Sequence, residues 1–382
     1  MRLRTGIRIA EERDWNKLKI AIAHEWLTNM AGSEACVLNF CRIFKEAPIF
    51  TTVYNPDAID PEIKSHKIIT SFLQFGRKRV TGHQKYFPLM PLACNLLNAK
   101  DYDVILSSSH CCIKGLRKKK DAVHISYCHT PMRYAWVYED EYCKNMKPFK
   151  KALVKILLAY MRWWDFRQVK NVDYFIANST LVKERIKKYY KRDAVVIPPP
   201  VRCSRFSISE KIGDYYLAFS RLVPYKRFDI AVEACSELGK KLIVIGDGPE
   251  KERLEKLAAP CVTFLGYQND DTVNKYVSEC KALLFPGEED FGIVPVEVMA
   301  AGRPVIAYGK GGVLDSIIDG KTGVFFKEQT VGSLVDAINQ FETMDFDPDK
   351  IREHALLFDE NVFQKKIKTF VTVVVNKQMV LK

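Results

Sequence analysis

Short runs of apolar and β-branched residues recur along most of this chain, and each is followed by a segment with helical periodicity. Near-continuous apolar strands that alternate with helices indicate parallel sheets covered on both faces, so the chain is predicted to be an α/β protein. The strand candidates are Leu18–Ala23, Ile49–Val53, Asp103–Leu106, Val123–Tyr127, Tyr174–Ala177, Tyr216–Phe219, Lys241–Ile245, Val262–Leu265, Ala282–Phe285, Val305–Ala307 and Val324–Phe326.

A length of 382 residues allows two domains, each with its own core. Pro198-Pro-Pro200 is the strongest internal break and is interpreted as a linker between two doubly wound domains. A rigid loop inside one domain is less favoured, because the strand–helix pattern restarts at Tyr215. The predicted domains are 1–200 and 201–360, and 361–382 is a candidate C-terminal helix that packs back on the first domain.

Composition is typical of a globular protein, with 47% hydrophobic and 27% charged residues. No apolar run approaches the ~20 residues that a membrane-spanning helix needs. The first residues lack the apolar core of a secretory signal. The eleven cysteines are odd in number and contain no C-x-x-C pair, which predicts a reduced, cytoplasmic protein with most cysteines in the core.

The net charge of +13 is concentrated in the first half of the chain. Residues 1–200 carry 35 Lys and Arg against 19 Asp and Glu, whereas the remainder carries 24 against 27. This asymmetry favours an anionic partner for the first half, such as a membrane surface, a lipid phosphate or nucleic acid. A basic surface that only aids solubility is the alternative.

Two carboxylates with seven residues between them, Glu289 and Glu297, follow the apolar run Ala282–Phe285. The order predicts a buried strand, a tight loop and a helix that begins near Pro295 and stops at Gly302. A helix N-terminus attracts phosphate, and carboxylates accept hydrogen bonds from sugar hydroxyls. The stretch therefore suits a ligand that is part phosphate and part sugar.

Basic side chains follow the first strand of the second half. Arg221 and Lys226 flank a predicted turn and could converge on a diphosphate, to which Arg supplies a planar fork and Lys a point charge. Surface charge is the alternative, and it fits Arg227 better than Arg221.

Glycines close the next two strands of the second half. Gly246 and Gly248 lie in a small turn that would allow a nucleotide to approach the backbone, although a G-x-G core is weak evidence by itself. Gly266 and Tyr267 occupy an equivalent position, where a base could lie.

Three further candidates follow strands of the first half. Gly32 lies in a small-residue turn before a helix, where backbone could approach a ligand, and a plain turn is the alternative. His110 follows Ser107-Ser-Ser109, and His129 follows another strand. A histidine at a strand end can orient a sugar or leaving-group oxygen, and His110 is the better candidate of the two.

Together these motifs resemble the family 4 glycosyltransferases, which are retaining, metal-independent enzymes of the GT-B fold. The resemblance covers roughly residues 18–330 and is strongest to the bacterial-type mannosyltransferases that build surface polysaccharides. The motifs are His24-Glu-Trp26, Gly32-Ser-Glu34, Ser107-Ser-Ser-His110, His129-Thr-Pro-Met-Arg133, Asn178-Ser179, Arg221 with Lys226, Gly246-Asp-Gly-Pro249, Phe264-Leu-Gly266 and Glu289 with Glu297.

The resemblance implies two Rossmann-like domains that face a cleft and transfer of a hexose from a nucleotide sugar, with GDP-mannose as first choice. Glu289 would hold the transferred sugar, Glu297 the ribose, and Arg221 and Lys226 the diphosphate, while His110 would contact the sugar near its reactive centre. The remaining donor-binding residues would be Gly32, Gly246, Gly248, Gly266, Tyr267, Phe291, Gly292, Ile293 and Val294.

No metal or other cofactor is implied, and nucleic acid is not an expected partner. The acceptor would be a glycan or a lipid-linked sugar, which the enzyme would reach by peripheral contact of its basic half with a membrane. Two positions depart from the family pattern: Ala31 replaces a glycine before Gly32, and Asp315 replaces a glutamate. A GT-B nucleotide-sugar epimerase, or an inactive GT-B protein that binds anionic partners, are the alternatives.

Overall fold

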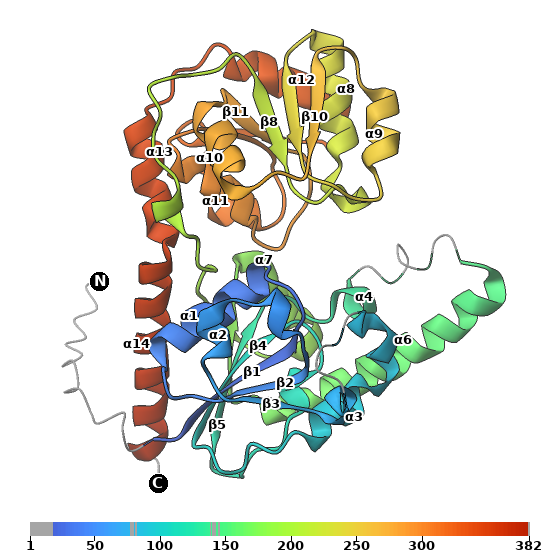
Figure 1. Cartoon of the computed structure of the whole chain (residues 1–382), viewed down its shortest axis with the longest axis vertical. Helices are drawn as coiled ribbons and strands as arrows, with labels where there is room; N and C mark the ends of the chain where they lie inside the picture. Colours follow the sequence, from blue (N-terminus) through green and yellow to red (C-terminus); the bar gives the residue numbers. More distant parts are fainter. Residues whose placement is uncertain are drawn as a thin grey trace. The chain divides into compact units, whose positions relative to one another are not determined.

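The structure, a computed structural model, describes residues 18–76, 80, 82–137, 139, 143 and 146–380. Within these residues the strands form two sheets, one with the order β3-β2-β1-β4-β5-β6-β7 and one with the order β10-β9-β8-β11-β12-β13 (Figure 1). Every pairing in the second sheet is parallel, as are those of β1 with β2 and β4 and of β2 with β3 in the first. Helices cover the sheets, so the predicted doubly wound α/β class is confirmed.

The strands of the first sheet are β1 (Ile20–Leu27), β2 (Ile49–Tyr54), β3 (Ile68–Thr70), β4 (Val104–Ser109), β5 (Val123–Cys128), β6 (Tyr174–Ala177) and β7 (Ala194–Val196). Those of the second are β8 (Tyr216–Phe219), β9 (Leu242–Ile245), β10 (Val262–Gly266), β11 (Ala282–Phe285), β12 (Val305–Tyr308) and β13 (Gly323–Phe326). The helices are α1 (Gly32–Ile43), α2 (Pro61–Lys64), α3 (Met90–Leu96), α4 (Arg133–Trp136), α6 (Pro148–Gln168), α7 (Thr180–Arg185), α8 (Phe228–Leu238), α9 (Lys251–Leu257), α10 (Asp270–Glu279), α11 (Ile293–Ala300), α12 (Val331–Phe341), α13 (Pro348–Ala355) and α14 (Glu360–Val380).

The second sheet has a separate core on each face. Leu283 and Phe285 of β11 pack with α10, α11 and α13, whereas Ala282 and Leu284 of the same strand pack with α8, α9 and α12 (Figure 1). Successive side chains of a strand point to opposite faces, so a strand that is covered on both sides must be apolar at every position. This is the physical reason why apolar runs predicted these strands well.

The strand order reverses once in each sheet. The chain moves outward from β1 to β3 and then returns to place β4 beside β1, and it does the same with β8 to β10 and β11. In open α/β sheets the loops at such a switch point diverge and leave room for a ligand at the carboxyl ends of the strands. Ligand-binding residues are therefore expected after β1 and β4 in the first sheet and after β8 and β11 in the second.

The described part of the chain divides into two compact units. One contains the described residues up to Tyr127, Met132–Phe175 and the chain from Val371 onward, and the other contains Cys128–Pro131 and Ile176–Phe370. Pro198–Pro200 has no regular secondary structure. The eleven cysteines form no disulfide within the described chain, and ten of them are buried.

Most strand boundaries agree with the sequence, and three local predictions need correction. Strand β1 extends to Leu27, so His24 and Glu25 lie inside it, and Ser107–Ser109 likewise belong to β4. Helix α11 begins at Ile293, two residues before the predicted start, because Gly292 adopts a positive φ of 87° as its N-cap. Glu297 consequently lies in the second turn of α11 instead of the first.

Candidate functional site

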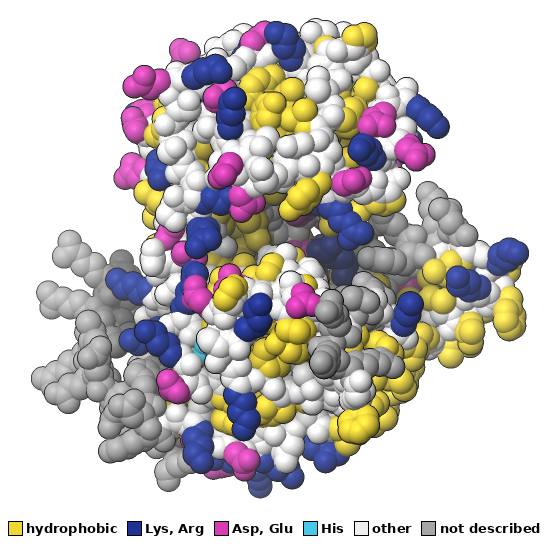
Figure 2. Space-filling view, viewed as in Figure 1, with side chains coloured by type: hydrophobic (Ala, Val, Ile, Leu, Met, Phe, Trp, Pro, Cys, Tyr) yellow, Lys and Arg dark blue, Asp and Glu magenta, His cyan; other side chains and the backbone are white. Residues whose placement is uncertain are grey.

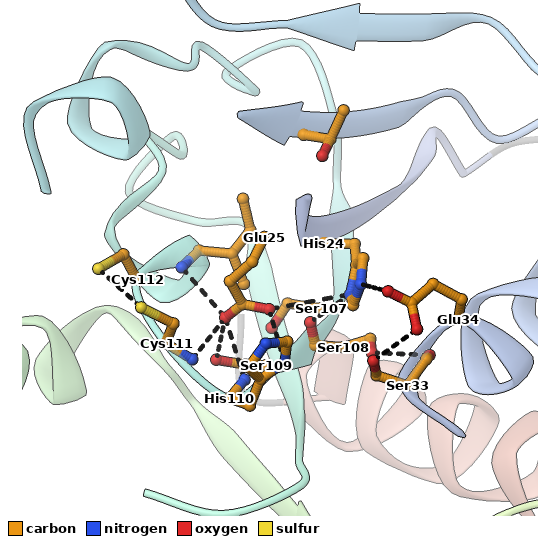
Figure 3. A network of polar contacts seen from close by, with 12 residues as sticks. His24, Glu25, Ser33, Glu34, Ser107, Ser108, Ser109, His110, Cys111 and Cys112 are labelled. Carbon is orange, nitrogen blue, oxygen red and sulfur yellow. Dashed lines mark hydrogen bonds and ion pairs between the residues drawn. The ribbon is translucent and has the colours of Figure 1, made fainter. Parts of the chain in front are cut away.

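In the first sheet, buried polar residues gather at the switch point between β1 and β4. We call His24, Glu25, Glu34, Ser109 and His110 the N-terminal cluster (Figure 3). Burial of these groups inside an α/β core is unfavourable unless each is paired or hydrogen-bonded. Their contacts therefore define what the cluster can do.

Glu25 binds the loop that follows β4. Its Oε1 atom accepts hydrogen bonds from the Ser109 hydroxyl at 3.1 Å and from the backbone amides of His110 at 3.0 Å and Cys111 at 2.8 Å. Its Oε2 atom lies 3.4 Å from Nδ1 of His110. Glu25 is fully buried, whereas the His110 side chain is 23% exposed, so the imidazole connects the buried carboxylate with the surface.

The second half of the cluster joins β1 to helix α1. Nδ1 of His24 donates to the Ser108 carbonyl at 3.0 Å, and Nε2 lies 3.5 Å from Oε1 of Glu34. The other oxygen of Glu34 accepts from the Ser33 hydroxyl at 2.8 Å. Glu34 is thus held at the N-terminal turn of α1, where the helix dipole also favours a carboxylate.

Burial and mutual charge set the protonation states of the cluster. Burial raises the pKa of Glu34, but the hydrogen bond with His24, the charge of His24 and the Ser33 hydroxyl outweigh it and lower that pKa to about 2. Burial lowers the pKa of His24, but Glu34 and Glu25 outweigh it and raise that pKa above its usual range. Burial raises the pKa of Glu25, but the imidazoles of His110 and His24, the Cys111 amide and Lys114 outweigh it and lower that pKa. Burial dominates for His110 and lowers its pKa, so a proton is favoured on His24 over His110.

In the second sheet, an ion pair joins the two sides of the switch point. Lys226 ends the short helix Pro224–Lys226 after β8, and its ammonium forms an ion pair with Glu289, which follows β11. We call Arg221, Lys226, Glu289 and Glu297 the C-terminal cluster. The Lys226 Nζ also lies 5.9 Å from the ring centroid of Phe285. Because Lys226 and Glu289 are only partly buried, both remain able to contact a ligand.

Three consecutive carboxylates follow β11, and each pairs with a different cation. Glu288 lies 3.8 Å from Lys310, Glu289 pairs with Lys226, and Asp290 pairs with Arg185. Only the middle carboxylate therefore faces the loop after β8. This arrangement supplies a physical reason, besides spacing, to choose Glu289 over its neighbours.

Glu297 occupies a less polar setting than Glu289. Burial raises its pKa to about 7, with Arg205 lowering the pKa and Asp270 raising it. A carboxyl group with this pKa exchanges a proton near neutrality, so any ligand that favours the ionised form will be bound in a pH-dependent way. The amides of Ile293 and Val294 belong to the first turn of α11, which has no intrahelical acceptor for them.

The glycine turn after β9 packs against the loop after β8. A Cβ atom at Gly246 would lie 1.9 Å from the carbonyl oxygen of Ser220, and one at Gly248 would lie 2.2 Å from that of Leu222. Backbone packing alone therefore requires glycine at both positions, and contact of the turn with a nucleotide stays a prediction. Arg221 is exposed, and Tyr267 is 84% exposed beside Gly266.

Some of the predicted site residues are in contact in the structure, and others are not. The structure pairs Lys226 with Glu289 and places His110 beside Glu25 of β1, whereas Arg221 and Tyr267 form no hydrogen bond or ion pair with the other described residues of the site. Gly32 is the first residue of α1, after Ala31, which caps the helix without a side-chain hydrogen bond. Asp315 accepts a hydrogen bond from the Thr180 amide at 2.5 Å.

Sequence reasoning assigned no role to Glu25 or Glu34, although both stood in quoted motifs. The available signal was the pair His24-Glu25 inside an otherwise apolar strand, because buried ionisable residues need partners. In the described part of the chain, no group of three or more His, Cys, Asp or Glu side chains is arranged to hold a metal ion.

Two family models match the chain. Residues 30–205 match the model described as Glycosyltransferase Family 4, and residues 205–357 match the model described as Glycosyl transferases group 1. The chain is 30% identical over 175 residues to an uncharacterized glycosyltransferase of Methanocaldococcus jannaschii, covering 44% of this chain and 49% of that protein. It is 33% identical over 140 residues to a GDP-mannose-dependent alpha-(1-6)-phosphatidylinositol monomannoside mannosyltransferase of Mycobacterium tuberculosis, covering 32% of this chain and 36% of that protein.

The chain therefore spans about half the length, or less, of these curated relatives. Among solved structures, the sucrose-phosphate synthase of Thermosynechococcus elongatus superimposes with a TM-score of 0.71 at 18% identity, covering 94% of this chain and 100% of that one. A similarity at this identity concerns the fold, which is the GT-B arrangement of two Rossmann-like sheets.

Proposed function

Because the chain belongs to the family 4 glycosyltransferases, we propose that it transfers a hexose from a nucleotide sugar to a glycan or lipid-linked acceptor. The Lys226–Glu289 ion pair at the switch point of the second sheet is the observation that carries this proposal. It brings a cation and a carboxylate together after β8 and β11, at the carboxyl ends of strands where α/β sheets bind ligands.

Each residue of the C-terminal cluster has a chemical task in this reaction. Lys226 and Arg221 would bind the diphosphate and offset the charge that develops as it leaves. Glu289 would accept hydrogen bonds from hydroxyls of the transferred sugar, and Glu297 from those of the ribose. In the free protein Glu289 neutralises Lys226, so the cation is held in place before the donor arrives.

Retention of configuration is proposed through a front-face route. The bond between the anomeric carbon and the phosphate oxygen breaks, and the leaving diphosphate takes its electron pair. The acceptor oxygen then bonds to the same face of the anomeric carbon, and the acceptor proton passes to the diphosphate. Glu289 binds the sugar in this scheme and forms no covalent intermediate.

GDP-mannose is the proposed donor. It is supported by the 33% identity to a protein described as GDP-mannose-dependent, over about a third of this chain. The test is slow donor hydrolysis, measured as released nucleoside diphosphate and free sugar across GDP-mannose, GDP-fucose and UDP-hexoses. A clear preference for GDP-mannose would support the proposal, and a preference for another donor would overturn this choice. Conversion to an epimer would instead favour the epimerase, and inertness toward every donor would favour an inactive binding protein.

Helix α6 is the proposed contact with a membrane. Phe149, Leu153, Ile156, Tyr160 and Trp163 follow one another at spacings of four and three residues, so they form one stripe along the helix. These side chains are 45–85% exposed. Figure 2 shows hydrophobic and basic side chains together over α6, at the right of the view.

Charge favours an anionic bilayer as the occupant of this stripe. Five basic residues lie on α6, while its sole acidic residue, Asp165, is buried beside Lys114. A second copy of α6 would bring the same cations to the interface and be repelled, whereas an anionic lipid surface attracts them. No helix of the described chain has the length and apolarity to cross a membrane.

Vesicle co-sedimentation at low salt tests this contact. We expect binding to vesicles that contain phosphatidylglycerol and little binding to phosphatidylcholine alone. Leu153→Ser with Ile156→Ser should abolish binding, while the matched control, Ile212→Ser with Leu357→Ser, exchanges equally exposed apolar residues and should keep it. Failure of the unmodified protein to bind the anionic vesicles would refute the contact, and concentration-dependent dimerisation lost in the α6 variant would assign the stripe to self-association.

A further inference from the structure

We propose that Glu25 is a positioning residue that fixes the tautomer of His110, so that Nδ1 carries the proton and Nε2 is the acceptor offered to the substrate. This inference rests on the proposed function only for its effect on turnover. The tautomer itself can be measured in the protein without a substrate.

The two oxygens of Glu25 perform different tasks. Oε1 receives the amides of His110 and Cys111 and the hydroxyl of Ser109, so it holds the backbone of the loop (Figure 3). Oε2 receives none of these bonds and lies 3.4 Å from Nδ1 of His110. One carboxylate therefore holds the backbone of His110 by a hydrogen bond and places its second oxygen beside Nδ1 of the same residue, at a distance longer than a hydrogen bond.

Neighbouring aromatic packing limits the rotation of the His110 ring. The Trp26 ring meets it edge-to-face with centroids 4.8 Å apart, and the His24 ring lies 5.9 Å away. Nδ1 is buried against Glu25, so the exposed fraction of the side chain belongs to the opposite side of the ring. Nε2 is separated from Nδ1 by one ring carbon and is the ring nitrogen that does not face Glu25.

Burial favours a neutral His110 ring, and Glu25 favours placing its single proton on Nδ1. A fully buried carboxylate can only accept, so a proton on Nδ1 is attracted by Glu25 and a bare Nδ1 would be repelled. Burial is the largest influence on the pKa of His110 and lowers it, and His24 and Arg133 act in the same direction. Glu25 and Glu34 favour a second proton on the ring but do not outweigh burial, so the neutral ring is favoured.

The variant Glu25→Gln reverses this arrangement without a change in size. Backbone amides can only donate, so the Gln carbonyl oxygen must take the place of Oε1. The Gln amide group then occupies the place of Oε2 and donates toward Nδ1 of His110. The proton is thereby displaced to Nε2, and the ring offers a donor where it had offered an acceptor.

The experiment is a long-range ¹H–¹⁵N spectrum of the full-length protein labelled on its 7 histidines, with His110 assigned from the His110→Gln spectrum. We expect the Nδ1–H tautomer in the unmodified protein and the Nε2–H tautomer in Glu25→Gln. The matched control, Glu342→Gln, removes a carboxylate that binds Tyr216, Lys240 and Lys281, and should leave the His110 signals unchanged. The Nε2–H tautomer in the unmodified protein would overturn the proposal, even if no variant could be purified.

Turnover supplies the second readout. We expect kcat to fall at least about tenfold in Glu25→Gln, as for other residues that orient a functional histidine, with a smaller change in the KM for the donor. In a His110→Ala background the same change should have little further effect, because the two residues act as a unit. Additive losses would show a merely structural role and overturn the proposal. If no donor is turned over, the proposed function fails while the spectra still decide the tautomer.

Discussion

The two switch points of this protein have the same strand order, but the polar residues at one are buried and those at the other are partly exposed. The N-terminal cluster is buried inside the sheet, and its carboxylates are occupied by imidazoles, hydroxyls and backbone amides of the protein itself. In the C-terminal cluster, Arg221, Lys226 and Glu289 lie on the segments after β8 and β11, and Glu297 lies in α11. The Lys226–Glu289 ion pair is partly exposed, and the side chains of Arg221 and Tyr267 are exposed.

The difference indicates that the N-terminal cluster holds a side chain in a fixed position, whereas the C-terminal cluster offers groups that can bind a ligand. Buried charges whose partners lie within the protein cannot relocate without a large cost, so the N-terminal cluster presents one preset group, His110. Side chains on loops keep donors and acceptors available for a ligand. Truncation of a buried carboxylate in the N-terminal cluster, such as Glu34, should accordingly reduce stability first, whereas substitutions in the C-terminal cluster should reduce turnover.

The largest effect is expected from the ion pair of the second sheet. Lys226→Ala and Glu289→Ala should each lower kcat/KM by about 10²- to 10³-fold, because each removes a group that meets charge or hydroxyls of the reacting donor. Lys310→Ala, which removes the partner of Glu288 on the same rim, is the matched control and should change it little. Steady-state kinetics decide the matter, and near-normal activity of both variants would remove these residues from the site.

The next effect concerns folding. Glu34→Ala should reduce the free energy of unfolding at pH 7 by about 3 kcal/mol, since it removes the carboxylate that pairs with the buried side chain of His24. The pKa of Glu34 is depressed to about 2 from 4.5, so its stabilising contribution is present above pH 4.5 and disappears as the pH falls toward 2. Chemical denaturation at pH 7 and pH 3 should show the difference between variant and unmodified protein shrinking in acid. An equal difference at both pH values would contradict this.

A smaller effect follows from Glu297, whose pKa is raised to about 7. A raised carboxyl pKa means that the folded state binds the proton more tightly than the unfolded state, so stability declines as the pH rises from about 4.5 to 7. Ribose hydroxyls favour the ionised form, so the KM for the donor should rise by up to about tenfold as the pH falls from 8 to 6. Glu297→Gln should remove that pH dependence, and a dependence that persists in the variant would belong to another group.

The smallest effect is expected at Tyr267. Because this side chain is 84% exposed, Tyr267→Ala should change the free energy of unfolding by less than about 0.5 kcal/mol. If the nucleotide base stacks on the ring, the KM for the donor should rise by a few fold, equivalent to about 1 kcal/mol. Titration of the variant with the nucleoside diphosphate alone measures this, and unchanged affinity would place the base elsewhere.

Sequence patterns predicted the strands of this protein because burial on both faces leaves a simple signal. Ala282–Phe285 is apolar at every position and forms β11 with the predicted bounds. The signal failed where polar residues enter a strand: His24 and Glu25 suggested that the first strand had ended, although β1 continues to Leu27. The short strand β3 was missed for lack of a long apolar run.

What the sequence determined by itself was the α/β class, and it made Glu289, Lys226 and His110 candidates for the site, because residue type and position after a strand are local properties. Tertiary structure alone decided which groups meet. Glu25 and His110 are separated by 85 positions, and they are neighbours only because β4 returns to pair with β1. Strand order is a property of the whole chain, so no local pattern could reveal that a carboxylate in one strand holds the histidine that follows another.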